Sequence, residues 1–119
     1  MKLGHIELFV RDVDAARTFY IDVLGLDLIE VQPGGFVWVA AGDVSILLRP
    51  IRAGESHPAA SAYAEAACGL VLYTDDLNRT AAQLRSRGLV FGGNDGSPKC
   101  LTFADPDGHW FQLVNPRQH

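Results

Sequence analysis

Two residues that can do chemistry stand near the start of the chain, His5 and Glu7. They are two positions apart in an alternating stretch, so a strand would place both side chains on one face. An imidazole can bind a metal or anchor a polar group, and a carboxylate with a raised pKa can abstract a proton beside a carbonyl. Glu7 is therefore the candidate catalytic residue. The alternative is structural: His5 hydrogen-bonds Glu7 or Gln112, and Glu7 pairs with His5 or an arginine, because an unpaired buried carboxylate is costly.

Aromatic side chains on later strands suggest a second kind of chemistry, the stacking of a flat ligand. Alternation places Trp110 and Gln112 on one face of the last strand, and Trp38 and Tyr73 lie on two earlier strands. If these faces line a cavity, its walls are broad and apolar, which suits a planar molecule. The alternative is that the tryptophans only fill the core. Arg49, at a strand end, is a minor candidate for binding an anionic group.

The first half of the chain has the pattern of a strand, a helix and three further strands. The helix lies between Asp12, a good N-cap, and Gly25, which can adopt the left-handed conformation that ends helices. Turn residues at 33–35 and 42–43 separate the later strands. The four strands are expected over residues 5–10, 26–32, 36–41 and 44–49.

The second half repeats this order after an alanine-rich linker, residues 52–67, which includes a short helical piece around 59–67. Asp75 and Asp76 can cap a helix that begins at Leu77 and ends before Gly88. The four strands are expected over residues 69–74, 89–92, 99–104 and 110–114, with a turn at 105–108 between the last two.

The two halves match as an internal repeat. HIELFVRDV, from His5, is similar to GLVLYTDDL, from Gly69, and AAGDVSILL is similar to PDGHWFQLV. The sequence therefore predicts an α+β fold of two tandem βαβββ modules. We expect one domain over residues 1–119, with module one at 1–51, the linker at 52–67 and module two at 68–119.

Composition narrows the class of protein. The chain has 119 residues, 48% hydrophobic and 20% charged, with a net charge of -4, which is typical of one soluble globular domain. Its basic residues are scattered, which disfavours a nucleic-acid partner, and no apolar run is long enough for a membrane span. With no signal peptide after Met1, we expect a cytoplasmic protein in which Cys68 and Cys100 are reduced thiols.

The sequence resembles the vicinal oxygen chelate superfamily in several short segments. They are HIELFV, FY and VLGL near the start, DDL at the second helix and FADPDGHWFQL near the end. This superfamily includes glyoxalases, bleomycin resistance proteins and dioxygenases. The resemblance covers essentially the whole chain. It implies that the paired modules form a curled mixed sheet around a cavity, and that the protein is a homodimer.

The resemblance also implies where a divalent metal would bind in the superfamily's metalloenzymes. The four corresponding positions are His5, Ile46, Gly69 and Gln112. Ile46 and Gly69 have no ligand atoms, whereas a transition metal is usually held by at least three protein ligands. Glu7 shares the face of His5, and His109 points away from Gln112 by alternation. We therefore expect no cofactor, although a divalent metal bound by His5 and Gln112 is possible.

These observations favour a small-molecule binding protein of the bleomycin-resistance type, which sequesters an aromatic or apolar antibiotic or metabolite without chemistry. The alternative is a divalent-metal-dependent lyase, isomerase or dioxygenase, so the sequence leaves open whether the protein is an enzyme. A subunit or regulator without a ligand is a third class. The expected ligand-binding residues are His5, Glu7, Trp38, Ile46, Tyr73, Trp110 and Gln112.

Overall fold

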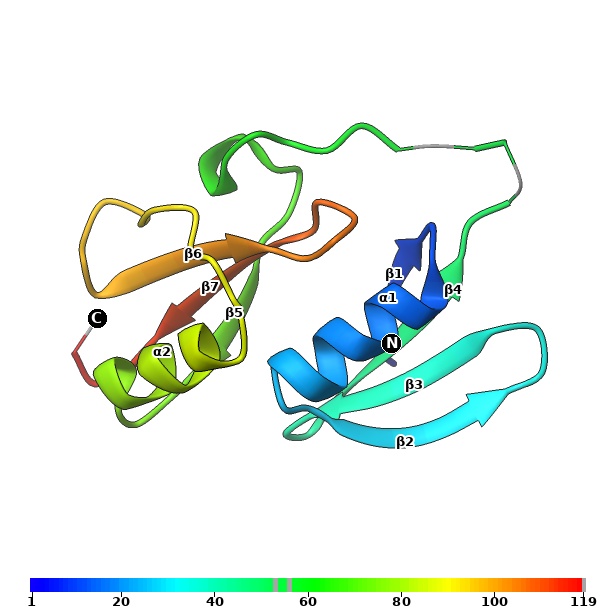
Figure 1. Ribbon diagram of the computed structural model, residues 1–119, viewed down its shortest axis with the longest axis horizontal. Coiled ribbons are helices and arrows are strands. Elements are labelled where there is room, and N and C mark those ends of the chain that lie inside the picture. Colours follow the sequence, from blue (N-terminus) through cyan, green and yellow to red (C-terminus); the bar gives the residue numbers. More distant parts are fainter. Residues whose placement is uncertain (53, 56, 119) are drawn as a thin grey trace. The chain divides into compact units, whose positions relative to one another are not determined.

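The computed structural model describes residues 1–52, 54–55 and 57–118. The chain divides into two compact units, Met1–His57 (unit 1) and Pro58–His119 (unit 2), which follow one another along the colour gradient of Figure 1. This division falls inside the linker expected over 52–67. Ala53 and Ser56 of that linker lie outside the described residues, as does the C-terminal residue of the second module.

Unit 1 is a four-stranded mixed sheet with one helical segment. The strands have the order β1-β4-β3-β2; β1 is parallel to β4, and the other pairs are antiparallel. Its elements are β1 (Ile6–Val10), α1 (Val13–Arg17), the π-helical segment η1 (Thr18–Val23), β2 (Asp27–Gln32), β3 (Phe36–Ala41) and β4 (Val44–Pro50). This is the strand, helix and three-strand order that the sequence predicts.

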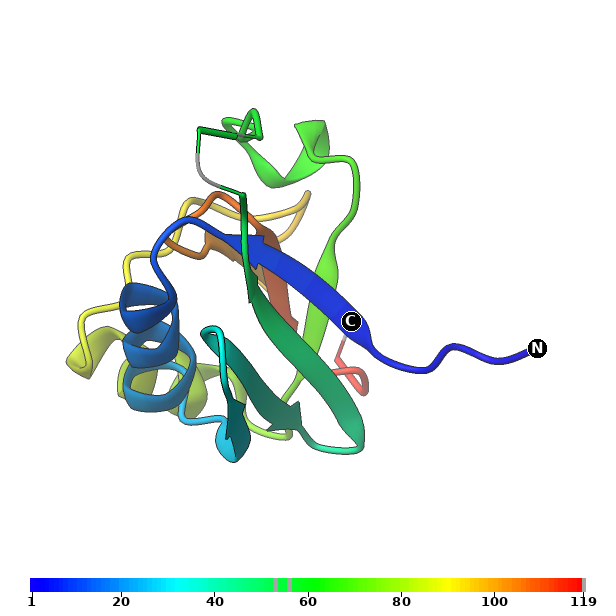
Figure 2. The same cartoon turned by 90° about the vertical axis from the view of Figure 1, so that its right-hand side faces the viewer.

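The helical segment of unit 1 begins at the expected cap. Oδ1 of Asp12 accepts hydrogen bonds from the backbone N–H groups of Asp14 and Ala15, at 3.0 and 3.2 Å. After Arg17 the chain widens into η1, and Gly25 follows with a φ of 75°. α1 contacts β3 and β4, and Figure 2 shows the helical segment beside the strands of unit 1.

The strand register gives the unit 1 sheet two different faces. Ile46 pairs with Ile6 and with Val39, and all three side chains share the face that carries the buried core. Leu47 pairs with Glu7 and with Trp38, which share the opposite face. Because side chains alternate along a strand, neighbours such as Ile46 and Leu47 belong to different surfaces.

Unit 2 is a three-stranded mixed sheet over its described residues, 58–118. Its order is β5-β7-β6, with β5 parallel and β6 antiparallel to β7. The elements are the short 3₁₀ turn η2 (Tyr63–Glu65), β5 (Leu70–Tyr73), α2 (Leu77–Ser86), β6 (Cys100–Ala104) and β7 (Trp110–Val114). Asp76 caps α2 by accepting from the Arg79 N–H at 3.1 Å, as the sequence predicts.

The strand expected over residues 89–92 does not form. Leu89 is buried, but the chain then turns through two glycines, and Gly93 has a φ of 110°. The Gly92 N–H still donates to the Thr102 carbonyl at 2.7 Å, and a single bridge joins Asn94 to Leu101. A glycine in this conformation interrupts the ladder of hydrogen bonds between neighbouring strands. The strand that alternation predicts over residues 89–92 is therefore not formed.

Aromatic packing fixes the core of unit 2. The rings of Phe103 and Phe111 stack with centroids 5.1 Å apart, and Phe91 packs edge-on against Phe103 at 5.9 Å. Phe103 and Phe111 belong to β6 and β7, so the stack joins two strands on one face of the sheet. Gln112 and Trp110 therefore share the other face.

None of the helices in the described ranges combines the length and apolarity needed to cross a membrane.

Candidate functional site

Three charged or polar side chains meet on the face of unit 1 opposite the core. Nε2 of His5 lies 2.8 Å from Oε2 of Glu7, and Nη1 of Arg49 donates to Oε1 of Glu7 at 3.1 Å. His5 and Glu7 are brought together by alternation along the chain, whereas Arg49 arrives from β4, which pairs with β1. We call His5, Glu7 and Arg49 the unit 1 cluster. Both partners expected for a structural Glu7 are present.

The unit 1 cluster controls the ionisation of Glu7. The hydrogen bond with His5 and the one from Arg49 lower the pKa of Glu7 below its ordinary value of 4.5, and they outweigh the opposing effect of burial. Glu7 is therefore ionised at neutral pH. This shift is opposite in direction to the raised pKa that proton abstraction at neutral pH would favour.

Trp38 adjoins the cluster. Its ring centroid lies 4.7 Å from that of His5, with the ring planes at 64°, and its indole N–H donates to Oε1 of Gln32 at 3.0 Å. The indole is half-buried. The face thus combines an aromatic surface with an imidazole and an ion pair, an arrangement that can stack a flat molecule and orient its polar groups.

The register corrects the expected placement of Ile46. Its side chain is 2% exposed and lies on the core face, with Ile6 and Val39. Leu47 is the β4 residue beside Glu7 and Trp38. The corresponding residue of unit 2 is Gln112, which pairs with Val71, so the structural equivalent of Gln112 is Leu47.

Gln112 and Trp110 share one face of unit 2 and are both covered. Gln112 is 5% exposed and Trp110 is 8% exposed. The Gln112 amide donates from Nε2 to Oδ2 of Asp95 at 2.9 Å, and the Trp110 indole donates to the Ala60 carbonyl at 2.8 Å. Residues 59–66, which include η2, form a segment that we call the strap; η2 contacts β6 and β7. The strap therefore supplies the acceptor that holds the Trp110 indole.

Sequence reasoning missed Asp95, which accepts the hydrogen bond from the Gln112 amide, and Tyr63 of the strap. Asp95 follows two glycines in a loop, where no periodicity marks it. Tyr63 is the one aromatic residue in the alanine-rich stretch 58–67. A single large side chain among alanines was the feature of the sequence that could have marked it. Its ring packs against Gly69, the position that lacks a ligand atom.

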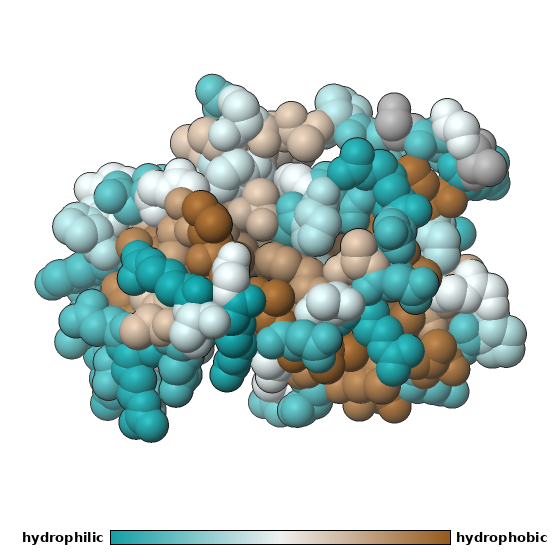
Figure 3. Space-filling view, viewed as in Figure 1, coloured by the Kyte–Doolittle hydropathy of each residue, from teal (hydrophilic) through white to brown (hydrophobic). Residues whose placement is uncertain are grey.

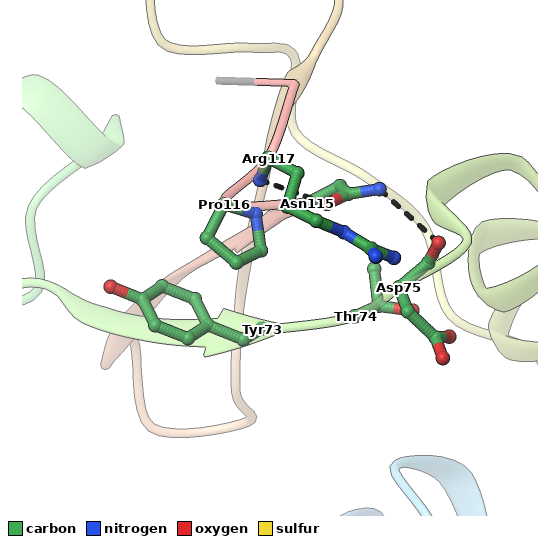
Figure 4. Close-up of a pocket in the computed structure, with 6 residues that line it drawn as sticks. All are labelled: Tyr73, Thr74, Asp75, Asn115, Pro116 and Arg117. Atoms are coloured by element: carbon green, nitrogen blue, oxygen red, sulfur yellow. Dashed lines mark hydrogen bonds between the residues drawn. The ribbon is translucent and has the colours of Figure 1, made fainter.

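Tyr73 lies away from this covered region, in a pocket where β5 and β7 end. Its side chain is the most exposed of the three expected aromatic residues, at 73%. The pocket is formed around Asn115, whose amide donates to the Asp75 carbonyl at 3.2 Å and accepts from the Arg117 N–H at 3.0 Å (Figure 4). Its lining residues are Tyr73, Thr74, Asp75, Asn115, Pro116 and Arg117. Neither Trp110 nor Gln112 lines it.

His109 belongs to the β6–β7 hairpin. Its Nδ1 lies 2.6 Å from Oδ2 of Asp105, and Oδ1 of Asp105 accepts from the N–H groups of Asp107 and His109. Burial alone would lower the pKa of His109, but the hydrogen bond to Asp105 and the charges of Asp105 and Asp107 raise it above 6.5. These contacts assign His109 to the turn.

The donor atoms in the described residues do not make a complete transition-metal site. No three His, Cys, Asp or Glu side chains gather in a suitable group within residues 1–52, 54–55 and 57–118. His5 and Glu7 supply two donors on one strand, and Arg49 adds a positive charge beside them. A transition metal is usually held by three or more protein ligands, so this donor set does not fit one.

Similar folds occur in several solved structures. TnmS3, an antibiotic binding protein from Streptomyces sp. CB03234, is 28% identical over 98% of each chain, with a TM-score of 0.68. A glyoxalase/bleomycin resistance protein from the same organism is 28% identical over 94% of this chain and 100% of its own, with a TM-score of 0.65. Lactoylglutathione lyase from Agrobacterium tumefaciens, 21% identical over 98% of this chain and 95% of its own, shares the fold with a TM-score of 0.71.

No curated protein matches the chain.

Two α+β units, each with its first strand parallel to its last, define the class of protein. The family model matches residues 2–113, and the chain belongs to the Glyoxalase/Bleomycin resistance protein/Dioxygenase superfamily.

Proposed function

We propose that the protein binds a small aromatic or apolar molecule and sequesters it without a complete metal site. The observation that carries this proposal is the contact of Trp38 with His5, beside the Glu7–Arg49 ion pair. A half-buried indole offers a face for stacking, and fixed polar groups beside it can orient a ligand. The 28% identity to an antibiotic binding protein supports the same class of ligand.

The expected ligand-binding residues take different parts in this proposal. His5, Glu7 and Trp38 form the unit 1 surface, with Leu47 in place of Ile46. Trp110 and Gln112 form the unit 2 surface. Tyr73 is exposed in the separate pocket around Asn115 and offers an aromatic edge there.

Tryptophan fluorescence tests the proposal. In Trp110→Phe protein, emission reports Trp38 alone, and we expect saturable quenching by at least one member of a panel of planar antibiotics and aromatic metabolites. Trp38→Phe is the matched variant, in which quenching by that compound should fall. Turnover of a compound without quenching by any of them would reject sequestration.

A divalent-metal-dependent enzyme is the second candidate, favoured by the 2.8 Å contact between two potential ligands, His5 and Glu7. Metal analysis of protein purified without an affinity tag separates the two candidates. Near-stoichiometric zinc, nickel, iron or manganese that is lost in His5→Ala would favour the enzyme. A metal-free protein that binds an aromatic compound would favour sequestration.

The proposal includes a cytoplasmic homodimer. The edge strand β2 supports self-association because Leu28, Ile29 and Val31 are exposed on it; apolar side chains gather over β2 in Figure 3. Light scattering after size exclusion tests this, with Ile29→Lys expected to give monomers. A wild-type monomer at all accessible concentrations would contradict the homodimer.

A further inference from the structure

Arg49 has hydrogen-bonding capacity that its own chain does not use. A guanidinium carries several N–H donors, and Nη1 of Arg49 gives one of them to Oε1 of Glu7 at 3.1 Å. No other group within residues 1–52, 54–55 and 57–118 accepts a hydrogen bond from Arg49, whose side chain is 48% exposed. The edge formed by Nε and Nη2 is therefore open, and two parallel N–H groups on such an edge match the two oxygens of a carboxylate.

The guanidinium is held in place before any ligand arrives. Phe9 pairs with Arg49 in the parallel ladder of β1 and β4, and Cζ of Arg49 lies 5.5 Å from the centroid of the Phe9 ring. Glu7, on the same face of β1 as Phe9, holds the guanidinium through Nη1. A side chain that is fixed in this way loses less conformational freedom on binding than an arginine that extends into solvent.

Trp38 lies within reach of this open edge. The indole belongs to the residue that pairs with Leu47, and Arg49 follows two positions later on the same face of β4. Such diagonal neighbours in an antiparallel pair lie about 7–8 Å apart, which a two-ring aromatic molecule can span. Leu47, between them, is buried and apolar. A flat ring stacked on Trp38 can therefore place a group on its rim beside Arg49.

The carboxylates on this face already have partners. Both oxygens of Glu7 are engaged in the unit 1 cluster. Glu30, which pairs with Trp38 from β2, accepts a long hydrogen bond of 3.5 Å from the Gln32 amide. Arg49 is thus the charged group with the largest open hydrogen-bonding capacity, and the group that complements it is an anion.

We infer that Arg49 determines the specificity of the unit 1 surface and selects planar aromatic anions. The ring lies on Trp38, and a carboxylate on its rim accepts two hydrogen bonds from Nε and Nη2 of Arg49. This inference rests on the proposed function and deepens it by naming the charge of the ligand. The net charge of the chain is -4, which repels anions at long range. A preference for an anion would therefore come from this local arrangement.

A matched pair of compounds tests the inference in the wild-type protein. 2-Naphthoate and 2-naphthamide have the same rings and differ in charge. Chemical shifts of the Trp38 indole N–H and the Arg49 Nε–H, followed during titration, report binding at both ends of the surface. We expect 2-naphthoate to bind about fivefold more tightly, because it can form a charge-assisted pair of hydrogen bonds at a half-exposed site. Equal binding would overturn the inference and leave sequestration standing.

Three variants locate the preference. Arg49→Gln removes the charge and should bind both compounds equally. Arg49→Lys keeps the charge without the two parallel N–H groups, so the preference should fall to about twofold. Arg17→Gln, at an exposed arginine of α1, changes the net charge by the same amount and should keep the full preference. A preference that persists in Arg49→Gln would contradict the role of Arg49, and an undiminished one in Arg49→Lys would contradict the paired hydrogen bonds.

A cationic analogue and salt complete the test. Tighter binding of 2-naphthylmethylammonium than of 2-naphthoate would overturn the inference, since it would mean that Glu7 or Glu30 faces the ligand. Raising the salt concentration from about 0.05 to about 0.5 M should reduce the preference for 2-naphthoate, because salt screens a half-exposed charge pair. No shift of Trp38 or Arg49 with 2-naphthoate would also overturn it. The proposed function fails separately, if no planar antibiotic or aromatic metabolite quenches Trp38.

Discussion

Arg49 donates from Nη1 to Oε1 of Glu7 over 3.1 Å, although the two residues are 42 positions apart in the chain. The parallel pairing of β1 with β4 makes this contact possible, because it brings Arg49 opposite Phe9 and beside Glu7. The guanidinium also lies 5.5 Å from the centroid of the Phe9 ring. Arg49 therefore has a defined place between a carboxylate and an aromatic ring, which the sequence alone marked only as a minor anion-binding candidate.

Removal of Arg49 should raise the pKa of Glu7 toward 4.5. Both the hydrogen bond and the charge of Arg49 lower this pKa, whereas the larger effect, the hydrogen bond with His5, remains in the variant. Carboxyl chemical shifts followed against pH in Arg49→Ala measure the change. Arg52→Ala, an exposed arginine of the same unit, is the control and should leave the midpoint unchanged. An unaltered Glu7 midpoint in Arg49→Ala would contradict the ion pair.

The same shift predicts how the unit 1 cluster depends on pH. A carboxyl group whose folded-state pKa is below its unfolded value contributes stability above about pH 4.5, and this contribution is lost as the pH falls through the folded value. We therefore expect the difference in unfolding free energy between wild type and Glu7→Gln to decrease below about pH 4.5. Urea unfolding across this pH range is the measurement, and a constant difference would contradict the ion pair's contribution.

Ile46 and Leu47 should respond differently to truncation because they face opposite sides of β4. Ile46→Ala leaves a cavity in the core and should cost about 2–5 kcal/mol of unfolding free energy. Leu47 pairs with Trp38 across the ladder, so Leu47→Ala should change the emission of Trp38 in Trp110→Phe protein, while Ile46→Ala should not. The reverse result would mean that the register is shifted by one residue.

The length of a turn explains why the repeat alignment matches Ile46 with Gln112, whereas the strand register matches Leu47 with it. The internal repeat aligns AAGDVSILL with PDGHWFQLV and so equates Ile46 with Gln112. The two hairpins are of different lengths: Ala41 pairs with Val44, whereas Ala104 pairs with Trp110. Extra residues in the second turn shift the register, and a shift of one residue turns a side chain to the other face. An alignment that matches the turn glycines cannot detect this.

Local patterns predicted most of the fold, while contacts between distant segments had to come from the structure. Caps at Asp12 and Asp76 and the alternation of the strands depend on neighbouring residues, so the sequence contains them. The pairing of Gln112 with Asp95, and the position of Tyr63 over Gly69, depend on how a loop and a linker fold back onto the sheet. No periodic pattern encodes such a return, and the predicted site was therefore incomplete there.

His109 should stabilise unit 2 more at low pH than at high pH. Its folded-state pKa is raised, so the contribution is fully present below about pH 6.5 and is lost as the pH rises through the folded value. We expect His109→Asn to lose about 1–2 kcal/mol at low pH and distinctly less well above the folded pKa. Urea unfolding at about pH 5.5 and about pH 8.5 measures this difference. His57→Ala, at an exposed histidine of unit 1, is the control, and a loss for His109→Asn that does not vary with pH would disprove the charged pair.

The two thiols should differ in reactivity because one is accessible and the other is not. Cys68 is exposed, and Cys100 is buried on β6; both are free. A thiol must reach solvent as a thiolate in order to attack a disulfide reagent, so one thiol per chain should react in the native protein and the second only after unfolding in urea. Cys68→Ser should remove the fast reaction, and Cys100→Ser should remove only the slow one. Rapid reaction of both thiols in the native protein would show that the face of β6 next to Tyr63 is open, and would contradict the covered position of Cys100.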